Sequence, residues 1–204
     1  MIHTGKHFRK TLGVFVLSLM LSGGASYLAA CSEPAAKEIS ELQRKTWNNP
    51  DDAALWLRLG NAYARAENYR KAEESYRKAL SVDSSFAAAL PALGAACFNQ
   101  RNYPEALVHF RKYRELAPDD SLRNYDVGNV LLQMQEYDKA ITAYQKAIAN
   151  SLFFEEAYYN LAICCLRSGN RTRAEEIYRL LVKKNNYLAV SLKEHLDRAD
   201  NTLR

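Results

Sequence analysis

The stretch WLRLGNAY, residues 56–63, predicts a helix built to pack closely against a second one. Its tryptophan, the leucine three residues later and the tyrosine four residues after that leucine fall on one helical face. Gly60 lies near this face and leaves room for a neighbouring backbone. Ala72 and Tyr76 then supply a small and a large residue for the second helix. The stretch and its surroundings therefore predict a helical hairpin.

The same pattern recurs with a period of 34 residues. Three series of positions share this period: Gly60, Gly94, Gly128 and Ala162; Ala72, Ala106, Ala140 and Ala174; Tyr76, Phe110, Tyr144 and Tyr178. A fixed period of this length is typical of repeat proteins, in which each unit is one supersecondary element. The sequence predicts four such units, at 53–86, 87–120, 121–154 and 155–188.

With Ala72 and Tyr76, the residues of 56–63 resemble the tetratricopeptide repeat family, and Pro118 fills the closing proline position of the second unit. The resemblance implies an all-α fold, a right-handed superhelical solenoid of about four helical hairpins. It also implies that the protein binds other proteins.

Both ends of the array are predicted to be capping helices. At 38–50, Ile39, Leu42 and Thr46 form one weak apolar stripe, which suits a partial helix covering the first unit. The segment 189–204 has a stronger stripe, made by Val190, Leu192, Leu196 and Ala199. Such half-buried terminal helices are what a solenoid requires for solubility.

Turn and capping residues fix the expected helix boundaries. Turns between paired helices are predicted at Glu67-Asn68, Arg101-Asn102 with Pro104 following, Gln135-Glu136 and Gly169-Asn170. The first helices are predicted to begin after an N-cap at Asp51 or Asp52, Ser84 or Ser85, Asp119 or Asp120, and Asn150 or Ser151.

Residues 1–30 have the pattern of an export signal. Three basic residues and no acidic one come first, and the apolar run at 12–21 follows. This run is about ten residues long, whereas a membrane-spanning helix needs ~20. A cleaved signal peptide is therefore the favoured interpretation, and an uncleaved N-terminal anchor is an alternative.

The signal ends in Leu28-Ala29-Ala30-Cys31, which resembles the bacterial lipobox. The resemblance implies cleavage before Cys31 and lipidation of that cysteine, with 31–37 as a tether. Ser32, in place of an aspartate, implies the outer membrane, with the protein facing the periplasm. A cleaved, soluble secretory protein is the other alternative.

The charge of the chain gives no sign of a nucleic-acid partner. The formal net charge falls from +5 to +2 after cleavage, because residues 1–30 hold three basic residues and no acidic one. A nearly neutral domain lacks the electrostatic footprint that nucleic-acid binding requires.

The sequence predicts a protein without catalytic activity, cofactor, metal or small-molecule substrate. Cys97 and Cys165 occupy a core position of the repeat, and adjacent Cys164 and Cys165 are unsuited to a mutual disulfide. The sequence has no Cys-x-x-Cys, no His-Glu-x-x-His and no glycine-rich phosphate loop. A thiol-dependent enzyme that uses Cys97 or Cys164 is the remote alternative.

The resemblance also implies a concave inner wall lined by fixed positions on the first helices. The candidate binding residues at and near these positions are Asn61, Phe98, Asn99, Tyr125, Asn129, Leu132, Gln133, Tyr159, Asn160 and Leu166. Tyr125 and Tyr159 are predicted to stack one repeat apart, while the amides are predicted to pair with the backbone of a peptide. Leu57 replaces the lysine of the family's chaperone-tail clamp, so binding of a C-terminal carboxylate is disfavoured. Alternatively, the terminal helix or lipid covers part of this wall.

Basic residues of the second helices predict an outer ridge: Arg77, Lys78, Arg111, Lys112, Lys146 and Arg179. Either the ridge is paired with neighbouring glutamates in solvent, or it contacts anionic lipid or glycan.

The leading functional hypothesis is a lipid-anchored scaffold for protein partners of the cell envelope. Under this hypothesis the protein resembles the lipoproteins that help assemble type IV pilus secretins. An adaptor for a cell-wall hydrolase or for the outer-membrane protein assembly machine is the alternative.

Overall fold

The computed structural model describes residues 34–149, 151 and 154–201, and this part of the chain folds into helices. The predicted signal peptide and Cys31 lie outside the described residues. None of the helices in the described part combines the length and the apolar character that crossing a membrane requires.

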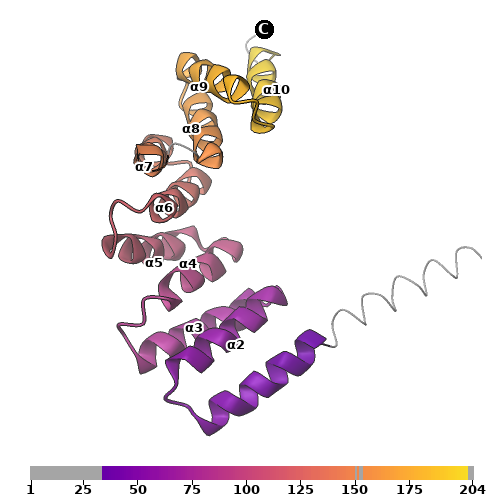
Figure 1. Cartoon of the computed structure of the whole chain (residues 1–204), viewed down its shortest axis with the longest axis vertical. Helices are drawn as coiled ribbons and strands as arrows, with labels where there is room; N and C mark the ends of the chain where they lie inside the picture. The colour runs from indigo at the N-terminus through magenta and orange to yellow at the C-terminus, as the bar shows by residue number, and fades with distance from the viewer. Residues whose placement is uncertain (1–33, 150, 152–153, 202–204) are drawn as a thin grey trace, which may run out of the picture.

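Within the described residues, an N-terminal helix over 34–48 precedes nine further helices. These are α2 (Ala53–Arg65), α3 (Tyr69–Val82), α4 (Ala89–Asn99), α5 (Tyr103–Glu115), α6 (Ser121–Gln133), α7 (Tyr137–Ala149), α8 (Glu155–Arg167), α9 (Arg171–Lys183) and α10 (Leu188–Asn201). From α2 to α10, each helix packs against the next one along the chain. The helices form one curved stack with the N-terminal helix and α10 at opposite ends (Figure 1). The predicted all-α helical solenoid is confirmed.

The turns between paired helices share one backbone conformation with the period of the sequence. Left-handed backbone, with positive φ, occurs at Glu67, Arg101, Gln135 and Gly169. The next residue then donates its backbone N–H to a carbonyl five residues earlier, as from Asn68 to Tyr63 at 2.9 Å. This bond satisfies a carbonyl left open at the helix end. The predicted turns are confirmed at all four places.

Two of the four predicted helix starts are confirmed. The carboxylates of Asp52 and Asp120 accept backbone N–H bonds of 3.1 and 2.9 Å at the starts of α2 and α6. The predicted cap at Ser84 or Ser85 is wrong, because Asp83 accepts two hydrogen bonds from Ser85 and holds that segment in a turn, so that α4 begins at Ala89.

The predicted start of α8 at Asn150 or Ser151 is also wrong, although Asn150 itself lies outside the described residues. The helix begins at Glu155, directly after Phe154, whose ring packs 4.6 Å from the ring of Tyr125. A tertiary contact therefore sets this boundary.

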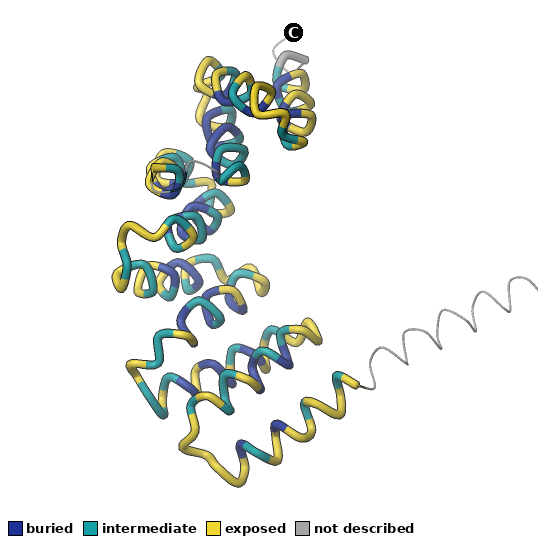
Figure 2. Tube along the Cα trace, viewed as in Figure 1, coloured by how far each residue is buried: buried dark blue, intermediate teal, exposed yellow. Residues whose placement is uncertain are grey.

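The glycine of each first helix lies against an aromatic ring of the second helix. A methyl group added at Gly60 would lie 2.4 Å from the Tyr76 ring, and one at Gly128 would lie 2.7 Å from Tyr144. The close helix contact predicted from the period is present, but the atoms nearest to the glycine belong to the aromatic ring and not to the paired alanine. Buried residues follow the contacts between successive helices through the whole stack (Figure 2).

The terminal helices are half repeats in register with the array. Moving α3 back by 34 residues gives 35–48, and moving α8 forward by 34 gives 189–201, which match the N-terminal helix and α10. Leu42 and Thr46 are buried against the first unit, and Leu192 and Leu196 are buried at the other end.

The N-terminal helix includes residues 34–37, the part of the predicted tether that the structure describes. Ala35 and Ala36 favour helix. Where a repeat has Ala72 and Ala79, this helix has Glu38 and Lys45. Those charged side chains make its outer face unsuited to a further repeat, as expected of a cap.

Candidate binding surfaces

The predicted binding residues all lie on first helices, namely α2, α4, α6 and α8. These helices are neighbours in the stack, since α2 contacts α4 and α6 contacts α8. Asn99 and Gln133 are exposed, whereas the other eight are partly buried. The structure therefore places them along one wall, but several take part in holding that wall together.

A hydrogen-bond network joins α6, α7 and α8. The Asn160 amide donates to the Asn129 side-chain oxygen at 3.0 Å and to the Tyr125 hydroxyl at 3.2 Å. The Tyr144 hydroxyl donates to the same Asn129 oxygen at 2.8 Å. Asn129 and Asn160, predicted to pair with a peptide backbone, thus bind each other and two tyrosines.

The first unit repeats part of this arrangement. The Tyr76 hydroxyl donates to the Asn61 side chain at 2.8 Å, and burial raises the pKa of Tyr76 to about 12, so the hydroxyl keeps its proton. The Asn99 amide donates to the carbonyl of Ala95 at 2.8 Å. Four of the five predicted amides therefore have intramolecular hydrogen bonds.

The predicted stack of Tyr125 on Tyr159 is replaced by other ring contacts. Tyr125 packs against Phe154 and Tyr144, with ring centroids 4.6 and 5.8 Å away. The Tyr159 ring lies edge-on to His195 of α10, at 6.3 Å. Phe154 packs on Tyr125 at the start of α8, and α10 covers part of the wall beside Tyr159.

The apolar positions are more open. Phe98 packs edge-on against Tyr103 at 5.4 Å and stays partly exposed, as does Leu132. Leu166 lines a cavity of about 310 Å³ between α8 and α10. The other residues that line this cavity are Ile163, Arg167, His195, Arg198 and Ala199. This cavity is a hollow at the α10 end of the predicted wall, and a partner can enter it.

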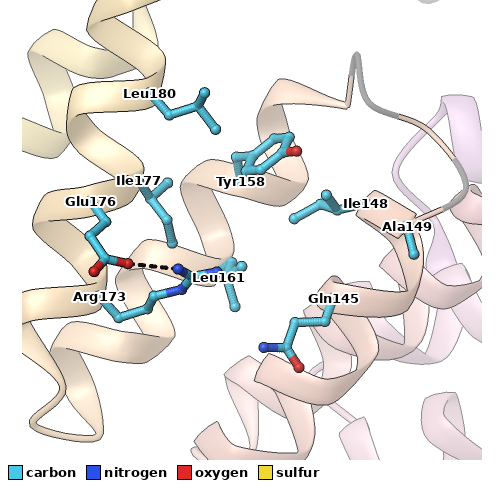
Figure 3. A pocket seen from close by; sticks show the side chains of 9 residues that line it. All are labelled: Gln145, Ile148, Ala149, Tyr158, Leu161, Arg173, Glu176, Ile177 and Leu180. Carbon is cyan, nitrogen blue, oxygen red and sulfur yellow. Dashed lines mark hydrogen bonds and ion pairs between the residues drawn. The ribbon is translucent and has the colours of Figure 1, made fainter.

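Two further crevices open where a second helix meets the next unit. One, of about 610 Å³, lies between the N-terminal helix, α2 and α3, and the other, of about 310 Å³, lies between α7, α8 and α9 (Figure 3). The two crevices are lined by residues at equivalent positions three repeats apart. The pairs, one residue from each crevice, are Gln43 and Gln145, Trp56 and Tyr158, Leu59 and Leu161, Lys71 and Arg173, and Glu74 and Glu176. In the second crevice Arg173 pairs with Glu176 at 2.6 Å.

The 34-residue pattern by itself does not indicate these crevices, although the matched pairs are visible between positions three repeats apart. At the two junctions between them, the glutamine position holds Arg77 and Arg111. Arg77 pairs with Glu73 at 2.8 Å and with Glu105. On the same ridge, Arg179 lies 3.6 Å from Glu175. Paired residues of this kind favour the solvated interpretation of the ridge.

The thiols lack the features of a nucleophile. Cys97, Cys164 and Cys165 are almost fully buried. Burial raises the pKa of Cys97 and of Cys164 to about 12, so both thiols stay protonated at neutral pH. The thiol-enzyme alternative is therefore disfavoured.

Comparison with known families matches the tetratricopeptide repeat at residues 53–86 and 125–189. Over 54% of its own length, the chain is 29% identical to tetratricopeptide repeat protein 37 of Xenopus laevis. Over 42% of its own length, it is 35% identical to a peroxisomal targeting signal receptor of Candida albicans. It is 25% identical to Hsp70-Hsp90 organizing protein 1 of Glycine max over 86%. The chain spans 7%, 14% and 30% of these relatives.

Several solved structures share the fold. MamA of Desulfovibrio magneticus RS-1 matches with a TM-score of 0.71 at 20% identity, over 80% of this chain and 93% of the other. YrrB, a TPR protein with an unusual peptide-binding site, matches with a TM-score of 0.70 at 19% identity, over 82% and 88%. Pseudomonas aeruginosa pilF matches with a TM-score of 0.66 at 22% identity, over 88% and 82%. Likeness at these identities concerns the fold.

Proposed function

The chain carries tetratricopeptide repeats, and we propose that it is a non-enzymatic scaffold that binds a protein of the bacterial cell envelope. The observation that carries the proposal is the wall of first helices, which ends in the open hollow between α8 and α10. Partly exposed apolar side chains along such a wall suit an extended or helical polypeptide. The fold shared with YrrB, a protein with a peptide-binding site, supports this use of the wall.

Within that function we propose attachment to the outer membrane through lipid on Cys31 and a role in assembling an envelope complex, such as a type IV pilus secretin. The lipobox-like residues 28–31 support the anchor, and the client class rests on the resemblance of the signal, tether and repeats to pilus-assembly lipoproteins. An adaptor for a cell-wall hydrolase or for the outer-membrane protein assembly machine would use the same wall with a different client.

Crosslinking in intact cells tests the wall. A photoreactive residue at position 166 should capture one main partner, and the same residue at position 112, on the outer ridge, should not. Identification of the captured protein separates the secretin, hydrolase and assembly-machine clients. Capture from position 112 alone would contradict binding at the wall.

Binding strength gives a second test. A chain with both Tyr159→Ala and Leu166→Ala should bind the captured partner at least about tenfold more weakly, because truncation of a contact residue at an interface often costs ~2 kcal/mol. The matched control, Arg111→Ala with Lys112→Ala, should bind normally. Equal affinities of the two variants would reject the wall.

The anchor has its own test. A Cys31→Ala protein should leave the membrane fraction or accumulate as an uncleaved precursor, because acyl chains are its proposed anchor. Intact-protein mass decides the question: a mature wild-type chain that begins elsewhere, or lacks lipid mass on Cys31, would refute lipidation.

A further inference from the structure

Three side chains of metal-binding type gather where α3, α4 and α5 meet, and a fourth, His109, borders them. Glu73 comes from α3, Cys97 from α4 and Glu105 from α5, and one ligand atom of each lies within 4.8 Å of the others. His109 follows Glu105 by one turn on α5, with its Nε2 atom 3.8 Å from a Glu105 oxygen. One sulfur, one imidazole nitrogen and two carboxylate oxygens are ligands that Zn²⁺ accepts in a tetrahedral site.

The Nε2 atom of His109 is available as a metal ligand. This atom is buried and has no hydrogen-bond partner among the described residues, and only 14% of the side chain is exposed. A buried polar atom without a hydrogen-bond partner is unfavourable, so a cation beside it would remove a penalty.

The two carboxylates are already held in place by neighbouring donors. Arg77 donates to both glutamates, Gln100 donates to Glu73 at 2.6 Å and Asn102 donates to Glu105 at 2.8 Å. Metal sites commonly orient their carboxylate ligands by such outer contacts. The glutamate side chains are 21% and 33% exposed, so a cation can reach them from solvent.

The repeat fold does not require this set of residues. The equivalent sets at the next two junctions are Leu107, Leu131, Lys139 and Ala143, and Ile141, Cys165, Arg173 and Ile177. An ion-pair cluster alone would need only Arg77 and the two glutamates. Cys97 occupies a core position of the repeat, and of these three junctions only this one combines a thiol and an imidazole with two carboxylates.

We propose that Glu73, Cys97, Glu105 and His109 bind one zinc ion. On binding, the Cys97 sulfur exchanges its proton for a bond to zinc, and the proton passes to solvent. One thiolate and two carboxylates carry three negative charges, which zinc and Arg77 together balance. Because the thiol must lose a proton and the imidazole must be neutral, affinity falls as the pH falls. No local sequence pattern indicates the site, because its residues come from two units and three helices.

Cobalt is the probe for the test, since a cobalt–thiolate bond gives an ultraviolet charge-transfer band. The reduced, metal-free mature protein should develop this band with one Co²⁺ per chain, and one equivalent of Zn²⁺ should abolish it. Competition with a chromophoric chelator then gives the zinc affinity. A wild-type protein without the thiolate band would overturn the proposal.

Matched cysteine variants assign the ligand. Cys97→Ala should lose the band and bind Zn²⁺ at least about a hundredfold more weakly, because loss of residues that only orient metal ligands already costs roughly 10–100-fold. Cys164→Ala removes an equally buried thiol and should bind Zn²⁺ like the wild type. Equal affinities of the two variants would reject the site. Glu105→Gln, at a partly exposed position, gives a second ligand variant should Cys97→Ala fail to fold; unchanged zinc affinity there would also reject it.

Discussion

Three residues other than glycine hold the left-handed backbone that ends the first helices. Glu67, Arg101 and Gln135 have φ values of 56°, 62° and 61°, and only the fourth turn uses a glycine, Gly169. For residues with a Cβ atom this conformation costs ~1–2 kcal/mol. The carbonyl bonds that it allows at the helix end explain why the chain keeps it.

Gln135→Gly should therefore raise the free energy of unfolding by up to about 1 kcal/mol, because glycine adopts this conformation without steric strain but has more freedom to lose on folding. Urea unfolding measures the change. Gly169→Ala should have the opposite effect at the equivalent position. A Gln135→Gly protein less stable than the wild type would show that the side chain makes a contact that outweighs its strain.

Asp126 on α6 is a partly buried carboxylate without an ion pair or hydrogen bond among the described residues. Burial, with a smaller effect from Asp120, raises its pKa from 3.8 to about 6. The folded protein then holds a proton that the unfolded chain has lost between these two pH values. The contribution of Asp126 to stability therefore falls as the pH rises through this window, and the penalty persists above it.

Asp126→Asn should raise the free energy of unfolding at pH 7.5 and change it little at pH 3.5, where the carboxyl is protonated in both states. Chemical unfolding at the two pH values measures the difference. The exposed Asp119→Asn should show no such dependence. An Asp126→Asn protein that gains nothing at pH 7.5 would mean that the carboxylate is solvated in the folded state.

At the scale of a helix pair, the space between glycine and ring determines what each unit tolerates. The methyl group of an alanine at Gly60 or Gly128 would come within 2.4 or 2.7 Å of a tyrosine ring, but one at Gly94 would lie 3.1 Å from Phe110. Alanine also favours helix over glycine by ~1 kcal/mol, which offsets a mild clash.

Gly60→Ala and Gly128→Ala should each destabilise the protein by ~1–3 kcal/mol, the usual cost of overpacking a core. Gly94→Ala should cost less than either, because the Phe110 ring needs to move by only a few tenths of an ångström. Thermal unfolding of the three variants gives the order. A larger loss for Gly94→Ala than for the others would show that helix pairing does not depend on this spacing.

How far the sequence could predict these elements depends on whether the cause is local. The starts of α2 and α6 depend on Asp52 and Asp120, which directly precede these helices, so the local sequence pattern was enough to predict them. The start of α8 involves packing of Phe154 on Tyr125, which the pattern does not contain.

The same distinction applies to the binding surfaces. The period placed Asn129 and Asn160 on the first helices, but their mutual hydrogen bond depends on the distance between two units. The cluster around Cys97 likewise forms only when residues of three helices meet. Repeat periodicity predicts position within a unit, and it leaves the contacts between units undetermined.

At the scale of the whole molecule, a capping helix closes each end of the array. The N-terminal helix covers the first unit with Leu42, and α10 covers the last unit with Leu192 and Leu196. Outward-facing charges on both caps pair within their own helix, as Glu41 does with Lys45 at 2.6 Å and Lys193 does with Asp197. Each cap thus buries one apolar face and presents a polar one.

Because each helix mainly touches its neighbours, damage at one end should stay near that end. Leu192→Ala leaves a cavity beneath α10, and Leu42→Ala leaves one beneath the N-terminal helix; each typically costs ~2–5 kcal/mol. Amide hydrogen exchange measures where protection is lost. Leu192→Ala should expose amides of α8, α9 and α10 while α2 and α3 keep theirs, and Leu42→Ala should do the reverse. If either variant lost protection evenly from end to end, the four units would unfold as one body, and local opening at the α8–α10 hollow could not occur independently of the rest.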